Sequence, residues 1–203
     1  GLHKHDINRA VISSVVPNLT RSMQKNIIRL FDVQPLMVDH QVETGLKKET
    51  IPEELGSDLL ANAAQAHYMH PNQPVVVVDF GTALTLTTVD SEGAVLGASI
   101  APGLVTAVNA LFGNTAQLPQ VELKIPQTVI GRNSQESIRS GIMFGYAGMV
   151  KSIIERTEEE LGCEVFVIAT GGLSQTIAPL IARINQVSAM HTLDGLRLIS
   201  ELN

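Results

Sequence analysis

The chain has 203 residues, of which 44% are hydrophobic and 17% charged, and its formal net charge is -6. This size and polarity predict a globular protein with a buried core, and the acidic balance argues against general nucleic-acid binding. The sequence contains no apolar run of membrane length and no leader pattern, so we expect neither a membrane span nor a signal peptide. The single cysteine, Cys163, excludes an internal disulfide and favours a cytoplasmic location.

The first part of the chain predicts short strands and two helices. Residues 10–16 and 35–38 are apolar strand candidates. Between them, Asn18 is a candidate N-cap for a helix with apolar residues at spacings of four, namely Leu19, Met23, Ile27 and Phe31. A second helix is expected to begin at Ser57 or Asp58.

The middle of the chain predicts a buried strand followed by a hairpin. Residues 75–78 are four consecutive valines, residues 84–89 alternate, and residues 94–97 are apolar again after a turn at 90–93. Pro102-Gly103 opens a helix over residues 104–112, and residues 113–129 are expected to be mostly loop because prolines interrupt them.

A long helix is predicted after Asn133, which forms a capping box with Glu136. Its apolar residues extend around more than one face, so we expect it to be largely buried. Its small residues Gly141, Gly145 and Gly148 would allow a partner helix to approach closely. A strand over residues 165–169 and a helix over residues 174–184 follow.

Two strand ends carry glycines that suit a phosphate ligand. In Asp79-Phe80-Gly81-Thr82, the glycine allows close backbone approach, the threonine donates a hydrogen bond, and the carboxylate can hold a cation. The alternative is an ordinary hairpin with an aspartate at its mouth. Thr170-Gly171-Gly172 lies between a strand and a helix, which is a suitable platform for a nucleotide. Together they predict two loops that face one cleft.

Five motifs in order make the chain resemble the type III pantothenate kinases of the acetate kinase, sugar kinase and actin superfamily. They occupy residues 11–17, 79–83, 96–104, 130–137 and 169–173. The resemblance implies an α/β, two-lobed ribonuclease H-like (actin-like ATPase) fold with mixed sheets, here with lobes at residues 1–78 and 79–203. It also implies a homodimer that phosphorylates pantothenate with ATP, the first step of coenzyme A synthesis. A divalent metal such as Mg²⁺ and a monovalent cation, K⁺ or NH₄⁺, would assist.

The resemblance assigns ATP-binding and cation-binding roles residue by residue. Asp79 matches the ligand of the monovalent cation. The ATP-binding positions correspond to Gly81, Thr82, Thr170, Gly171 and Gly172.

The substrate side departs from the family pattern. Gly56-Ser57-Asp58-Leu59 stands where the family has Gly-Ala-Asp-Arg, so Asp58 is the candidate general base and Leu59 replaces a pantothenate-binding arginine. The alternative for Asp58 is a carboxylate that caps the helix. A family tyrosine falls on Glu49, and Ser134 keeps the hydroxyl that would touch pantothenate across the dimer. Lys47 or Lys48 could replace the missing guanidinium.

The sequence also lacks the family's Asp-x-Gly-Asn-Thr loop, which grips the ATP phosphates. On the order of 50 residues would be needed for the strands and helix that accompany it. We therefore expect an incomplete first lobe. Either the chain is a fragment, or a stretch of it has been omitted, or the protein has lost half of its phosphate site. Little kinase activity is expected from residues 1–203 alone. Loss of the arginine favours a second hypothesis, a non-catalytic paralogue that binds or regulates.

Overall fold

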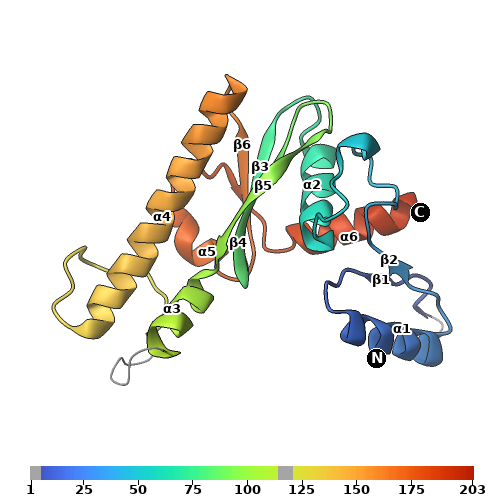
Figure 1. Ribbon diagram of the computed structural model, residues 1–203, viewed down its shortest axis with the longest axis horizontal. Helices are drawn as coiled ribbons and strands as arrows, with labels where there is room; N and C mark the ends of the chain where they lie inside the picture. The colour runs from blue at the N-terminus through green and yellow to red at the C-terminus, as the bar shows by residue number, and fades with distance from the viewer. Residues whose placement is uncertain (1–5, 114–120) are drawn as a thin grey trace. The chain divides into compact units, whose positions relative to one another are not determined.

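The computed structural model describes residues 6–113 and 121–203 (Figure 1). The chain folds into two compact units. Unit 1 comprises Gly1–Gln73, Val89–Leu96 and His191–Asn203, and unit 2 comprises Pro74–Thr88 and Gly97–Met190. These units interleave along the chain, so they do not test the lobes at residues 1–78 and 79–203, which stay a prediction.

Two helices form the core of unit 1. Helix α2 (Ser57–Met69) packs against α6 (His191–Leu202). Gly195 of α6 lies so close to the backbone of Ala61 that a β-carbon would overlap it. Small residues at this crossing therefore let the helices approach closely, and the buried apolar residues around it are Val38, Leu46, Ile51, Leu60, Ala61, Ala63, Ala64, Val89, Val95, Leu198 and Ile199.

A small parallel sheet and a helix complete unit 1. Strand β1 (Val11–Ile12) pairs with β2 (Leu36–Met37), and α1 (Pro17–Phe31) connects them. The strand predicted over residues 10–16 is thus wrong in length, because Ser14 Oγ accepts the backbone N–H of Val16 at 3.2 Å and turns the chain out of the strand. The expected cap Asn18 is also wrong. The helix begins at Pro17, whose fixed φ suits the first helical position.

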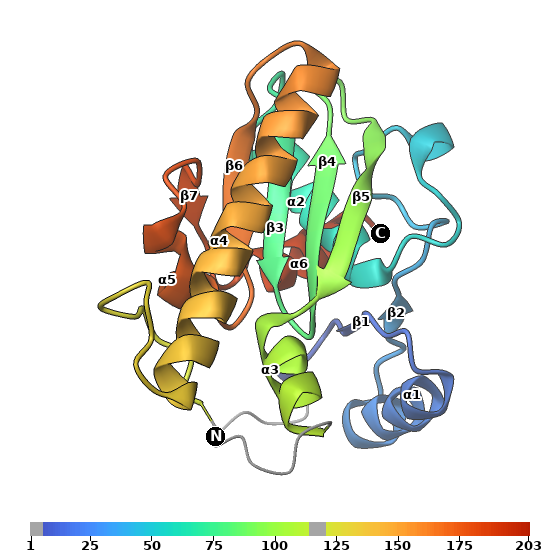
Figure 2. The ribbon, with the colours of Figure 1, turned by 60° about the vertical axis from the view of Figure 1, so that its left-hand side comes forward.

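Unit 2 is built on a five-stranded mixed sheet in the order β5-β4-β3-β6-β7 (Figure 2). The predicted hairpin is confirmed: β3 (Val75–Phe80), β4 (Ala83–Val89) and β5 (Val95–Pro102) follow one another with short turns. The tip of the β4–β5 hairpin is assigned to unit 1. Strand β6 (Phe166–Thr170) runs parallel to β3 and to β7 (Gln186–Val187).

The long helix α4 (Ser134–Leu161) covers one face of this sheet (Figure 2). Val76, Val78 and Phe80 of β3 lie in the same core as Met143 and Ile154 of α4. The expectation that the helix is buried around more than one face is wrong. Its buried residues lie on the side that packs against the sheet, whereas the glycines at 141, 145 and 148 are exposed.

The remaining helices are short. Helix α3 (Leu104–Gly113) follows β5, and α5 (Ser174–Ile177) with a 3-10 turn, η3 (Ala178–Leu180), follows β6. The helix predicted over residues 174–184 ends early because Pro179 has no N–H to donate. Another 3-10 turn, η2, spans Lys48–Thr50. No helix within the described ranges is long and apolar enough to cross a membrane.

Candidate functional site

The two glycine-bearing loops lie side by side at one edge of the unit 2 sheet. Asp79 of β3 is the register partner of Thr170 of β6, and the two strands are parallel. The segments that follow them therefore leave the sheet at the same end. The expected proximity of these two loops is therefore confirmed, whereas the cleft that they would face stays a prediction. The start of α5 lies beside them, since Ser174 N and Oγ both donate to Gly171 O, at 3.1 and 2.7 Å.

Gly171 is what allows the two loops to meet. Its φ is +88°, a left-handed conformation that favours glycine, and a β-carbon there would overlap Asp79 Oδ1 and the backbone of Phe80. The neighbouring Gly172 has open space around its β-position and no left-handed φ. Only the first glycine of the pair is thus required by the local geometry.

A third loop, at the start of α3, joins the site. Gly103 N donates to Thr82 O at 3.0 Å, and Thr106 Oγ1 donates to the same carbonyl at 2.8 Å. A β-carbon at Gly103 would overlap the carbonyl oxygens of Gly81 and Thr82. The sequence predicted Pro102-Gly103 as the opening of a helix and as part of the motif at residues 96–104, but not its contact with Thr82. The glycine that directly follows a strand was the signal that it could also pack against the neighbouring turn.

Several buried hydroxyls lie on the sheet face that carries Asp79. The hydroxyl groups of Thr85, Thr87 and Thr170 are buried, and they have no hydrogen-bond partner within the described part of the chain. Side chains alternate along a strand, and Ala169 lies in the core beneath α4, so Thr170 points to the opposite face. Asp79 points there by the same alternation. A carboxylate beside a buried, unpaired hydroxyl fits a hard cation that prefers oxygen ligands.

The candidate substrate residues start helix α2 in unit 1. Asp58 is exposed in the first turn, and its Oδ1 accepts the backbone N–H of Leu59 at 3.0 Å. Asp58 is thus not the N-cap of the helix, which is Gly56, but its carboxylate accepts a first-turn N–H and keeps a second oxygen for other chemistry. Ser57 is buried, with its Oγ 2.7 Å from Ser13 Oγ, and Gly56 is the N-cap. Leu59 is only 7% exposed, so this position presents no polar group.

Each of the two lysines that could replace the missing arginine has another partner in the structure. Lys47 forms an ion pair with Glu92, and this hydrogen bond raises the pKa of the Lys47 ammonium. Lys48 Nζ donates to Gln41 O at 2.8 Å. Glu49 is exposed. The Lys47 and Lys48 ammonium groups therefore both have partners other than a substrate carboxylate.

The segment before α4 holds Ser134 at an exposed helix start. Asn133 Oδ1 accepts from Glu136 N at 3.0 Å, and the Glu136 carboxylate accepts from Asn133 Nδ2 and from Arg132 N, both at 2.8 Å. The predicted cap by Asn133 is confirmed, and the Glu136 side chain reaches back to the Arg132 N–H rather than to the Asn133 N–H of the usual capping box. These hydrogen bonds, first that from the Arg132 N–H, lower the pKa of Glu136.

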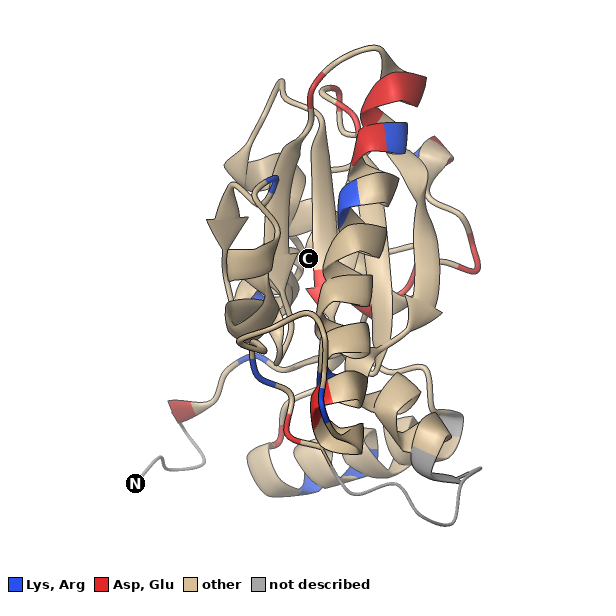
Figure 3. Cartoon of the chain, turned by 90° about the vertical axis from the view of Figure 1, so that its left-hand side faces the viewer, with Lys and Arg blue, Asp and Glu red and all other residues tan. Residues whose placement is uncertain are grey.

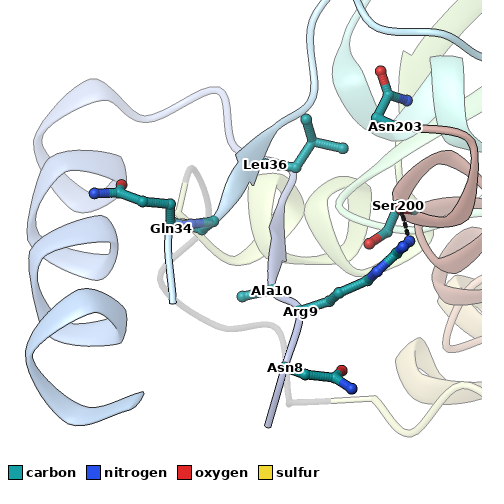
Figure 4. A pocket seen from close by; sticks show the side chains of 8 residues that line it. Asn8, Arg9, Ala10, Gln34, Leu36, Ser200 and Asn203 are labelled. Carbon is teal, nitrogen blue, oxygen red and sulfur yellow. Dashed lines mark hydrogen bonds between the residues drawn. The ribbon is translucent and has the colours of Figure 1, made fainter. Parts of the chain in front are cut away.

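A separate pocket of about 370 Å³ in unit 1 contains none of the predicted site residues (Figure 4). Arg9 Nη1 donates to Ser200 O at 2.6 Å, and Asn203 Nδ2 donates to Glu43 O and Ile199 O. Two of its polar side chains, Arg9 and Asn203, thus already form hydrogen bonds within unit 1. Within residues 6–113 and 121–203, no three acidic, histidine or cysteine side chains are placed to hold a metal ion.

Comparison with known proteins shows a consistent similarity. Residues 1–156 match the sequence profile of the type III pantothenate kinase family. The chain is 40% identical to a type III pantothenate kinase of Finegoldia magna, over 98% of this chain and 78% of the relative. It is also 40% identical to one of Moorella thermoacetica, over 100% and 80%. A solved structure described as a Baf family transcriptional activator from Campylobacter jejuni superposes with a TM-score of 0.63 at 19% identity, covering 96% of this chain and 83% of that one. This last similarity concerns the fold alone.

Proposed function

Because the chain belongs to the type III pantothenate kinase family, we propose that it transfers phosphate from ATP to pantothenate, the first step of coenzyme A biosynthesis. The membership also confirms the predicted α/β, actin-like ATPase fold. The observation that carries the proposal is the meeting of the Asp79 and Thr170 loops at one sheet edge, which Gly171 makes possible. The cytoplasm is the location we propose for this reaction.

The unit 2 loops are the proposed nucleotide site. Exposed Thr82 would offer its backbone N–H and its hydroxyl to the ATP phosphates. Gly81, whose own N–H donates to Ala83 O at 3.1 Å, would let the phosphates approach the backbone closely, while Gly171 and Gly172 leave room beside the strand end for the nucleoside. ATP would bring a divalent ion such as Mg²⁺, whose charge offsets that of the phosphates. Asp79, with the buried Thr170 hydroxyl, fits a monovalent cation such as K⁺ or NH₄⁺.

On the substrate side, the proposed general base is Asp58. Phosphoryl transfer to an alcohol requires a group that orients the hydroxyl and accepts its proton as the oxygen attacks. An exposed carboxylate at a helix start meets that need, and its hydrogen bond to Leu59 N fixes one of its oxygens. Gly56, Ser57 and Leu59 would line the pantothenate site around it.

We also propose a homodimer formed through α4, in which Ser134 approaches the partner's substrate pocket. The glycines at 141, 145 and 148 are exposed, and a β-carbon at any of them would meet nothing within 4 Å. Each glycine costs an isolated helix about 1 kcal/mol relative to alanine. The packing of the single chain does not require them, whereas close approach of a second helix would.

A non-catalytic role is the second candidate, and one observation favours it. The position of the family arginine is a buried leucine, and both neighbouring lysines have other partners. A carboxylate ligand such as pantothenate would then lack the planar cation that best binds it. The chain would in that case keep the fold and bind nucleotide without transferring phosphate.

Ligand binding and turnover, measured on the same preparation, separate the two candidates. Calorimetry gives the affinities for ATP with Mg²⁺ and for pantothenate, and a coupled assay gives pantothenate-dependent ATP turnover. Turnover above that of Asp58→Asn supports the kinase. ATP binding with turnover no higher than in Asp58→Asn supports the non-catalytic role, and absence of ATP binding contradicts both.

A further inference from the structure

A second concave surface in unit 2 lies at the start of α4, apart from the nucleotide loops. It has a volume of about 670 Å³, and none of the residues proposed above to contact ATP or pantothenate lines it. The residues that line it are Lys124, Ile125, Pro126, Gln127, Thr128, Arg132, Glu136 and Arg139. Basic side chains therefore reach it both from the loop that precedes α4 and from the helix itself.

The guanidinium groups of this concavity retain unused donors. The Arg132 side chain is exposed and donates no hydrogen bond within the described residues, where only its backbone N–H is engaged. Arg139 uses its Nε to donate to Glu122 O at 2.9 Å, which leaves its two terminal nitrogens available. Two planar cations thus border one cavity with donors to spare.

The local carboxylates cancel only part of this positive charge, because the lining contains three cations and one carboxylate. That carboxylate is Glu136, whose charge attracts both Arg132 and Arg139, although its hydrogen bonds go to the Arg132 backbone N–H and the Asn133 amide. Glu122 does not line the concavity, and its exposed ion pair with Lys124, with Oε2 and Nζ 3.2 Å apart, is weak. The concavity also lies at the positive end of a 28-residue helix, whereas the far end of α4 is acidic (Figure 3).

The loop that carries Lys124 and Arg132 has little regular structure, yet α4 fixes it in place. Ser140 Oγ donates to Val129 O, and Arg139 donates to Glu122 O. Gly131 packs against the helix backbone so tightly that a β-carbon would overlap Ser137 N. These contacts preorganise the concavity, so a ligand need not order the loop when it binds.

We infer that this concavity is an anion-binding site for a small ligand that carries a phosphate or a carboxylate group. Arg132 and Arg139 bind its oxygen atoms through paired N–H donors, and Lys124 adds a point charge at the rim. The site goes beyond the proposed kinase reaction, because its residues are distinct from those that would contact ATP and pantothenate.

The test uses the 203-residue chain, inorganic phosphate and, separately, acetate, at low ionic strength. Amide NMR shifts locate each anion and give its affinity. The decisive variant is Arg132→Gln, because this side chain holds nothing else in place; Arg139→Gln serves as a second variant. Lys151→Gln is the matched control, since Lys151 is another exposed cation of α4 but pairs with Glu155.

We expect shifts at residues 128–140, and an affinity that falls roughly tenfold to a hundredfold in Arg132→Gln but not in Lys151→Gln. Added salt should weaken the binding. The anion that binds more tightly identifies the group that the site prefers. Unchanged affinity in Arg132→Gln, shifts confined to the loops around Gly81 and Gly171, or no response to either anion would overturn the inference.

Discussion

At the scale of single residues, the candidate nucleotide site depends on one backbone conformation. Gly171 combines a left-handed φ with contact to Asp79 and Phe80, whereas Gly172 has neither constraint. A side chain at position 171 would be strained by its own backbone and would also push the two strand ends apart. The same pair of glycines therefore contains both a sensitive position and its natural control.

Gly171→Ala is expected to lower the free energy of unfolding by about 1–3 kcal/mol and to weaken ATP binding, because the added methyl must displace Asp79 or the β3 backbone. Gly172→Ala should change stability by no more than about 0.5 kcal/mol. Urea unfolding and ATP calorimetry on both variants measure this. Equal changes in unfolding free energy and ATP affinity at the two positions would mean that the close approach at residue 171 contributes to neither.

Leu59→Arg should tighten pantothenate binding by roughly tenfold to a hundredfold, because a guanidinium can form charge-assisted hydrogen bonds with a carboxylate. The site is only 7% exposed, so the arginine stem must stay buried while its head reaches solvent. Leu59→Met, which keeps the volume, is the control. Calorimetry should show ATP affinity unchanged in both variants, and an unchanged pantothenate affinity in Leu59→Arg would refute the pocket alignment.

At the scale of elements, the sequence predicted those with strong local signals. The valine run of β3, the hairpin turn and the Asn133 cap all lie where they were expected. Helix α6 was not predicted, because it carries Gly195 in its interior and its partner α2 is about 130 residues away in sequence. Glycine lowers helix propensity, and only the packed structure shows that it is needed against Ala61.

The α2–α6 contact contains a histidine that should make stability pH-dependent. His191 is fully buried, its Nε2–H donates to Asn62 O at 3.1 Å, and its Nδ1 has no partner among the described residues. Burial lowers its pKa, and nearby His70 adds to this, while the Asn62 hydrogen bond and Asp194 oppose it. The native state therefore favours the neutral ring more strongly than the unfolded state does.

Below the ordinary histidine pKa of 6.5, the unfolded chain binds more protons at this position than the native one. The contribution of neutral His191 is thus present above pH 6.5 and is lost as the pH falls below it. His191→Gln keeps a donor for Asn62 O but cannot titrate, so it should reduce the slope of unfolding free energy against pH in this range. Urea unfolding at several pH values measures the slope; an identical slope in both proteins would contradict the assignment.

At the scale of the whole molecule, the order of the motifs along the sequence predicted the family and fold better than it predicted the site. The motifs are local, so Asp79 and Gly171 could be recognised from neighbouring residues alone. The contact of Gly103 with Thr82, the buried hydroxyls of Thr85 and Thr87, and the cationic concavity at α4 arise from tertiary packing. No local pattern specifies such groupings, because their members come from separate elements.

The proposed homodimer is tested by Gly145→Leu. A β-carbon at this exposed position meets nothing within 4 Å among the described residues, and leucine has the higher helix propensity, so the variant should be at least as stable as the native protein. It should nevertheless sediment as a monomer, because the added side chain keeps two α4 helices apart. Lys151→Leu, on the same helix but outside the glycine stripe, should leave a dimer. Sedimentation velocity at matched concentrations measures the oligomeric state. A Gly145→Leu dimer, or a native protein that is itself monomeric, would exclude this interface. Loss of association without loss of thermal stability would identify the glycines at 141, 145 and 148 as the contact surface.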